Sequence, residues 1–312
     1  MKQKSSPSRA KENLRTLTTE KSNSASAELD TKSALAIARI INREDARVAA
    51  AVRRALPQIA RGIELIAHAL SQGGRLIYVG TGTSGRIAAL DAVECPPTFD
   101  VPPSMVQFII AGGSRALSGA AEADEDSRDL GRKEIARKRP GAKDVVVGIA
   151  ASGRTPFTIG ALTYAREHGA KTVAVVCNPR SPLGVAAHVE IVANVGAEVV
   201  AGSTRMKAGT AQKMILNMLT TGAMARIGYV YGNLMVNLHT KNSKLAERAI
   251  AIIEQLTDLD RRGAIRLLSR AQGRVPVALV MAKAGVKRDE ALIALKKSRG
   301  SVRRALASLH LK

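Results

Sequence analysis

Two short loops carry hydroxyl side chains between glycines, and their residue types suit the binding of an anion such as phosphate. The first loop, Gly80 to Gly85, has the sequence GTGTSG, and the second, 152–156, has the sequence SGRTP. Glycine permits positive φ angles and a close approach of the backbone to a ligand. A helix that begins directly after such a loop adds free N–H groups and a positive dipole end. Any tight strand-to-helix turn also favours glycine, so the hypothesis depends on the loop occurring twice.

The residues around these loops indicate which anion they bind. Each loop follows a short apolar run, and the carboxyl ends of neighbouring parallel strands face one crevice, so Ser84, Ser152 and Thr155 are expected to converge on one phosphate. Neither loop has the lysine of GxxxxGK[ST], and GTGTSG is not GxGxxG followed by an acidic residue about 20 positions later. The sequence therefore favours a phosphorylated small molecule over a nucleotide.

Alternating strands and helices must position these loops. Apolar runs predict five strands, at 75–79, 106–110, 144–149, 171–176 and 189–193. Helical spacing predicts helices at 84–93, 116–123, 127–138, 156–168 and 210–227. This alternation is typical of a parallel sheet with right-handed crossovers. We therefore expect an α/β fold in which helices cover both faces of a five-stranded parallel sheet.

Helical segments flank the α/β region on both sides. Before it, apolar spacing predicts one helix that ends near Ile41 and a second from Asp45 to Leu70, which Pro57 is expected to kink. After it, three short helices are predicted at 277–284, 288–297 and 301–309. The expected organisation is a disordered basic extension (1–18), a helical arm (19–72), an α/β domain (73–250) and a helical C-terminal module (251–312).

Composition limits the kinds of partner. The 312 residues are 46% hydrophobic, without an apolar run of about 18 residues or an apolar signal segment at the N-terminus, so we expect a cytoplasmic protein that does not enter a membrane. The net charge is +22, of which residues 1–21 supply +4 and residues 260–312 supply +11. An aromatic content of 2% argues against nucleic-acid binding, because single-strand binders stack bases on aromatic rings. Cys95 and Cys177 lack metal-site spacing and are expected to be buried thiols.

Several motifs resemble one family closely. GTGTSGR, ECPPTF and ASGRTP are similar to the sugar isomerase (SIS) phosphosugar-binding fold. Together with TEKSNSASAELD, IINREDARV, GAEVVAGSTRMKAGTAQK and GNLMVNL, they resemble the N-acetylmuramic acid 6-phosphate etherase family over about residues 19–248. The C-terminal segment resembles a small ubiquitin-associated-like helical module. The resemblance implies a phosphosugar substrate and removal of D-lactate from the sugar's 3-ether.

Cleavage of such an ether is tractable by elimination. In the open-chain sugar the C1 aldehyde acidifies the C2 proton, so a base takes that proton, lactate leaves from C3 and water adds back. The resemblance implies Glu94 as the acid and Glu125 as the base, and this scheme needs no metal or redox cofactor. We expect Glu94 to end the helix that starts at Ser84, where the helix dipole and Asp91 oppose its ionisation. Glu122 competes with Glu125 for the role of base, and Asp124 makes the cluster more acidic than is usual in the family.

The resemblance also assigns binding residues. It implies that Ser84, Ser152 and Thr155 hold the phosphate and that Glu198 holds a sugar hydroxyl. Lys207 and Arg205 are expected to meet the phosphate or the lactyl carboxylate, with ordinary surface charge as the alternative. Subunits share such crevices in this fold, so a partner's N-terminal arm could contribute Ser24 or Ser26. The apolar helix 210–227 is expected to contribute to a homodimer.

Two other functions remain open from the sequence. A non-catalytic phosphosugar sensor could keep the hydroxyl loops but would not need Glu94 and Glu125. An aldose–ketose isomerase would share the fold and Glu198 but would not need ECPPTF.

Overall fold

The computed structural model describes residues 17–119, 122–238 and 243–310. Strands β1 (Leu76–Gly80), β2 (Val106–Ile110), β3 (Val145–Ile149), β4 (Lys171–Val176) and β5 (Val189–Val192) form one parallel sheet in the order β2-β1-β3-β4-β5. Gly80 at the end of β1 is level with Ile110 of β2 and with Ile149 of β3. The loops that follow β1 and β3 therefore leave the same edge of the sheet, and the expected five-stranded parallel fold is confirmed.

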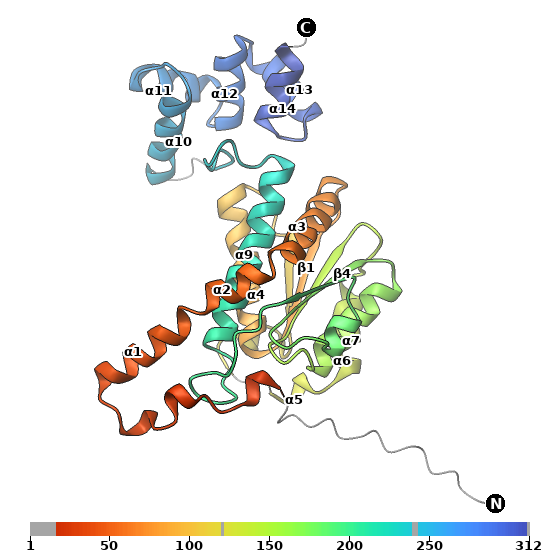
Figure 1. Ribbon diagram of the computed structural model, residues 1–312. Helices are drawn as coiled ribbons and strands as arrows, with labels where there is room; N and C mark the ends of the chain where they lie inside the picture. Colours follow the sequence, from red (N-terminus) through yellow and green to blue (C-terminus); the bar gives the residue numbers. More distant parts are fainter. Residues whose placement is uncertain (1–16, 120–121, 239–242, 311–312) are drawn as a thin grey trace, which may run out of the picture.

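Helices cover both faces of this sheet, as Figure 1 shows. One layer consists of α3 (Leu56–Ser71), α4 (Gly82–Phe99) and α9 (Lys207–Ile227), and the other contains α6 (Arg128–Arg137) and α7 (Pro156–Glu167). The short helices α5 (Glu122–Glu125) and α8 (Pro182–Val185) lie in connections.

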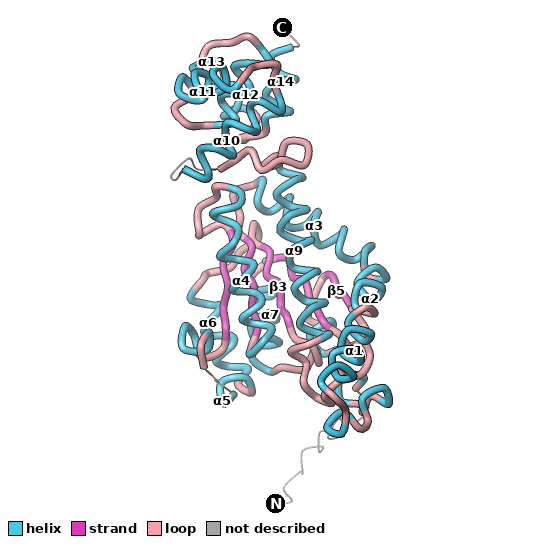
Figure 2. The backbone as a smooth tube through the Cα atoms, turned by 90° about the vertical axis from the view of Figure 1, so that its left-hand side faces the viewer, coloured by secondary structure: helices cyan, strands magenta, loops and turns pink. Residues whose placement is uncertain are grey.

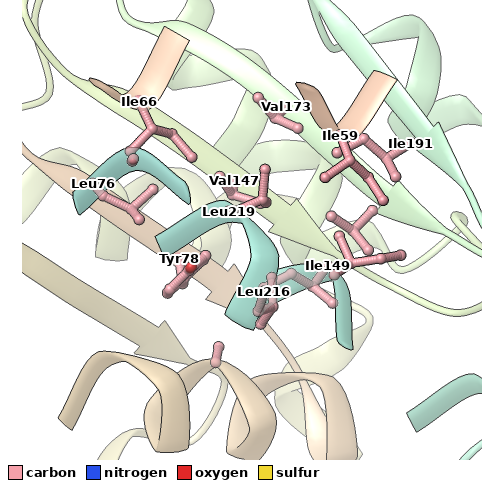
Figure 3. Close-up of a cluster of buried hydrophobic side chains, with 14 of the residues drawn as sticks. Ile59, Ile66, Leu76, Tyr78, Val147, Ile149, Val173, Ile191, Leu216 and Leu219 are labelled. Atoms are coloured by element: carbon pink, nitrogen blue, oxygen red, sulfur yellow. The ribbon is translucent and has the colours of Figure 1, made fainter. Parts of the chain in front are cut away.

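Alternate residues of the strands supply the two cores. Leu76 and Tyr78 belong to the cluster beneath α3, α4 and α9, whereas Ile77 and Val79 belong to the cluster beneath α6 and α7. Successive side chains of a strand point to opposite faces, which is why a strand covered on both sides is apolar throughout. Figure 3 shows Tyr78 among the buried side chains of the first cluster.

The N-terminal arm differs from the expectation of two helices. It contains α1 (Ala34–Asp45), α2 (Val48–Arg54) and α3, so the predicted 45–70 helix is divided rather than kinked. The division falls at Ala55, whose ψ of 0° is not helical, and Pro57 lies in the first turn of α3. Proline lacks the N–H that a continuous helix would require there, and the first turn is where that loss is tolerated.

The C-terminal helices form their own buried cluster at the end of the molecule where α9 finishes (Figures 1 and 2). They are α10 (Ser243–Leu256), α11 (Arg261–Arg270), α12 (Val275–Ala284), α13 (Arg288–Lys297) and α14 (Val302–His310). Arg304 donates a hydrogen bond to the carbonyl of Ile227 at 2.7 Å, so the cluster contacts the C-terminus of α9. The predicted extension 1–18 lies almost entirely outside the described residues.

Candidate active site

The first hydroxyl loop leads into the N-terminus of α4. Thr81 is the N-cap residue, and Gly82 takes a φ of +47°. The N–H of Gly85 bonds to the Thr81 carbonyl, which leaves the N–H groups of 82–84 without intrahelical partners, as at every helix start. Ser84 is buried, and its Oγ donates to Oε1 of Gln212 in α9 at 3.0 Å.

Glu125 lies directly beside this helix start. Its Oε2 accepts a hydrogen bond from Oγ1 of Thr81 at 2.9 Å. A Cβ added at Gly82 would lie 3.2 Å from Oε1 of Glu125, so only glycine leaves this carboxylate its full space. Helix α5, which carries Glu125, packs against α7. Glu125, which the resemblance implies as the base, therefore lies at the first hydroxyl loop, and its helix contacts the helix that follows the second.

The second loop leads into α7 in the same way. Thr155 is the N-cap residue but its side chain makes no capping bond, and the Ser152 hydroxyl accepts from the N–H of Arg154 at 3.2 Å. Gly153 has a φ of +70°, and a Cβ there would lie 2.3 Å from the Ser181 side chain. Both loops are thus shaped by glycine, and the alignment of Gly80 with Ile149 places them side by side.

Glu94 lies away from these loops within one chain. Helix α4 continues through Pro96 and Pro97 to Phe99, so the expectation that it ends at 93 is wrong. The buried Phe99 and the left-handed Asp100 fix its end instead. Glu94 is exposed and stands ten positions after Ser84, about 15 Å further along the helix axis.

Asp91, one turn before Glu94, is enclosed by polar partners. It accepts hydrogen bonds from Tyr78 at 2.8 Å, Asn217 at 2.7 Å and Thr220 at 3.1 Å. Burial is the dominant influence and raises the pKa of Asp91 above its usual value, although these hydrogen bonds act in the opposite direction. The carboxyl group connects β1, α4 and α9 and is not open to a ligand.

Glu198 and Lys207 have partners inside the protein. The fully buried Glu198 carboxylate accepts from the N–H groups of Lys207 at 3.1 Å and Ala208 at 2.9 Å, so it caps α9. The Lys207 ammonium lies 2.6 Å from Oε2 of Glu44, and both side chains are 1% exposed. The same Glu44 oxygen accepts from Asn23 at 2.8 Å. These contacts join the N-terminal arm to α9, whereas Arg205 is exposed.

The electrostatics of Glu44 follow from this pair. Burial alone would raise its pKa, but hydrogen bonds from Lys207 and Asn23 and the positive charges of Lys207 and Arg47 outweigh burial. The pKa of Glu44 consequently lies below its usual value, and the carboxylate remains charged beside the ammonium.

The remaining predicted residues divide between the arm and the core. Ser26 of the same chain donates to the carbonyl of Val199 at 2.7 Å, and Ser24 begins the short 3₁₀ turn Ser24–Ser26. Cys95 and Cys177 are buried free thiols, and burial raises the pKa of each to about 12. Glu122, the competitor of Glu125, begins α5, and only its backbone is among the described parts of the structure. Thr81 and Gln212 were not predicted, although the quoted motifs GTGTSGR and KAGTAQK contain them.

Two further properties concern ligands and membranes. In the part of the chain that the structure describes, no three His, Cys, Asp or Glu side chains are grouped so as to hold a metal ion. No helix among residues 17–119, 122–238 and 243–310 has the length and apolar character needed to cross a bilayer.

The fold and the paired helix starts define a SIS-domain protein. Residues 140–222 match the SIS domain model, and residues 58–166 match the model of the glucokinase regulatory protein N-terminal SIS domain. A Bacteroides fragilis structure described as a phosphosugar isomerase involved in capsule formation has a TM-score of 0.50, with 19% identity over 67% of this chain and 98% of that chain. At that identity the likeness concerns the fold alone.

Curated relatives identify the family. The N-acetylmuramic acid 6-phosphate etherase of Photorhabdus laumondii is 48% identical over 95% of this chain and 99% of its own length. The enzyme of the same name from Symbiobacterium thermophilum is 55% identical over 88% of this chain and 91% of its own length. This chain belongs to the N-acetylmuramic acid 6-phosphate etherase family.

Proposed function

We propose that the protein is a carbon–oxygen lyase that converts N-acetylmuramic acid 6-phosphate to N-acetylglucosamine 6-phosphate and D-lactate. The observation that carries this proposal is the identity of about half of all residues with etherases over almost their whole length. The reaction would serve the recycling of cell-wall amino sugars in the cytoplasm. A phosphosugar ligand also suits the two helix starts, because free N–H groups, hydroxyls and helix dipoles favour phosphate.

The reaction begins with the open-chain sugar. The phosphate binds at the starts of α4 and α7, where Ser84, Ser152 and Thr155 supply hydroxyls. Glu125, held by Thr81 at 2.9 Å, removes the C2 proton that the C1 aldehyde acidifies. Lactate then leaves from C3 as Glu94 protonates its oxygen, and water adds to the unsaturated aldehyde. Glu198 and Lys207, which the sequence resemblance assigned to the substrate, would act indirectly by fixing the start of α9.

We further propose that Glu94 reaches the crevice from the second subunit of a homodimer. Leu90 is 50% exposed, Val93 is 56% exposed, and both lie on the surface of α4 that carries Glu94. A two-fold axis crossing the exposed surface of α4 near Leu90, about midway along the helix between Ser84 and Glu94, would pair the helix with its antiparallel copy. Because a two-fold interface is reciprocal, the partner's Glu94 would then lie at the start of this chain's α4, level with Ser84 along the helix axis.

Lactate release tests the activity directly. The purified chain should release D-lactate from N-acetylmuramic acid 6-phosphate, and Glu94→Gln or Glu125→Gln should lower the rate by about 10²–10⁴-fold. In deuterium oxide, elimination followed by water addition places deuterium at C2 of the product. Lactate release that leaves C2 unlabelled would contradict elimination, and absence of lactate release would contradict the lyase assignment.

A phosphosugar sensor is the second candidate, because residues 58–166 match the regulatory-protein domain model. A sensor would bind N-acetylglucosamine 6-phosphate without releasing lactate from the lactyl ether. The two measurements together distinguish a sensor from a lyase.

A further inference from the structure

Gln212 lies beneath the phosphate-binding end of α4 and has an incomplete set of hydrogen bonds. Its side chain is 1% exposed, and its Oε1 accepts from the Ser84 hydroxyl at 3.0 Å. Its Nε2 is buried and has no hydrogen-bond partner among the described residues. Buried amide groups are normally paired, so an unpaired N–H donor next to a ligand-binding hydroxyl requires an explanation.

The direction of the Ser84 hydrogen bond decides what the hydroxyl can offer a ligand. Serine has one hydrogen to donate, and in this arrangement that hydrogen points to Gln212. A fully ionised phosphate group presents acceptors only. Ser84 therefore cannot donate to a phosphate while Gln212 accepts its hydrogen.

A half-turn of the Gln212 amide removes this conflict. The turn exchanges Oε1 and Nε2, so that Nε2 donates to Oγ of Ser84. The Ser84 hydrogen then becomes available to the ligand, and the unpaired N–H acquires an acceptor. The amide oxygen becomes the unpaired atom, which proteins tolerate better than an unpaired buried N–H.

We propose that Gln212 is a positioning residue that donates to Ser84 when substrate binds and thereby directs the Ser84 hydrogen to the sugar's phosphate. The inference rests on the proposed function for the identity of the ligand. It assigns a role to one residue of the KAGTAQK motif, and it makes the start of α9 part of the phosphate site.

The variants Gln212→Met and Gln212→Glu separate this role from packing. Methionine retains the length of the side chain without a hydrogen bond, whereas glutamate in its charged form can only accept and keeps the Ser84 hydrogen. Binding of N-acetylglucosamine 6-phosphate, measured by calorimetry, should weaken about 10-fold in Gln212→Met and about 100-fold in Gln212→Glu. KM should rise correspondingly while kcat changes little, because the contact is distant from C2 and C3.

Two controls make the result decisive. Gln107→Met removes an amide that donates to the Ser104 carbonyl at the other end of the sheet, and it should leave binding unchanged. In a Ser84→Ala background, the effect of Gln212→Glu should shrink to the part that comes from repulsion between its carboxylate and the phosphate, since the hydroxyl that it would misdirect is absent. This double variant also serves if Gln212→Met fails to fold.

Several results would overturn the inference. One is a Gln212→Glu variant that binds the sugar phosphate as tightly as wild type. Another is a Ser84→Ala/Gln212→Glu double variant whose fold-loss of affinity equals the product of the losses in the two single variants, because the two residues would then act independently. Failure of the wild type to bind the sugar phosphate would remove both the inference and the phosphosugar assignment. Gln212-dependent binding without lactate release would refute only the lyase assignment.

Discussion

A mixture of two inactive variants tests whether subunits share the active site. In the proposed dimer, each site combines Glu125 of one chain with Glu94 of the other. Glu94→Gln and Glu125→Gln homodimers would each lack one of these groups in both sites. A mixed dimer would contain one site with both glutamates intact and one site with neither.

The expected recovery follows from this count. Random exchange of equal amounts makes about half of the dimers mixed, and each has one working site of two, so about one quarter of wild-type lactate release should return. The physical basis is the separation of about 15 Å between Ser84 and Glu94 along one rigid helix, which is longer than the substrate's span from phosphate to C3.

The assay needs evidence that subunits exchange. The variants carry different affinity tags, are expressed together, and are purified through both tags in sequence, which yields mixed dimers with an expected half of wild-type activity per dimer. A pair of differently tagged Glu94→Gln chains is the matched control and should stay inactive. Tandem-purified mixed dimers that release lactate no faster than this control would refute a shared site.

The remaining predictions concern the residues that support the site. Lys207→Met should lower the free energy of unfolding in urea by about 3–5 kcal/mol, because it leaves the Glu44 carboxylate buried without its cation, and adding Glu44→Leu should restore part of that loss. The folded protein lowers the pKa of Glu44, so the ionised carboxylate should contribute its full stabilisation of the fold above the unfolded pKa of about 4.3. That contribution should be lost as the pH falls through the lower pKa of the folded state. The free energy of unfolding of wild type and of Glu44→Gln, compared across pH 2–7, measures the contribution. Thr81→Val removes the hydrogen bond that holds Glu125, the proposed base, and should lower kcat about 10-fold without changing the free energy of unfolding. Thr81→Ser keeps the hydroxyl and should have a kcat close to that of wild type. Gly160→Ala should cost at least about 1–3 kcal/mol, since the new Cβ would lie 2.2 Å from a backbone oxygen of α6, whereas Gly141→Ala meets no atom within 4 Å and should be neutral.

The sheet could be predicted from the sequence because its signals are local. Each strand is a short apolar run, and glycine and hydroxyl residues identify the loops after β1 and β3. The strand bounds differ from the predictions by one residue at most. The helix ends were harder to predict, because α4 passes through Pro96 and Pro97 and is stopped by the burial of Phe99, a tertiary effect.

The partners of charged side chains could not be predicted in this way. Lys207 stands in a polar, glycine-bearing motif and suggests a phosphate ligand, yet its ammonium pairs with Glu44, 163 positions earlier. No local pattern links these two positions. Glu198 is a comparable case, because its capping of α9 depends on a turn that brings the chain back over Lys207 and Ala208.

The motif GAEVVAGSTRMKAGTAQK thus combines two kinds of residue. Glu198 and Lys207 bury their charges to attach the arm and to fix the start of α9. In the proposed phosphate site this leaves backbone N–H groups and hydroxyls, rather than Lys207, as the ligands at the starts of α4 and α7. Such a site depends strongly on the direction of each hydrogen, because neutral donors contribute only when they point at the phosphate. The orientation of the Gln212 amide beneath Ser84 therefore matters more here than it would in a site where a lysine side chain binds the phosphate. Of the two Gln212 variants, Gln212→Glu should show the larger loss of affinity for the sugar phosphate.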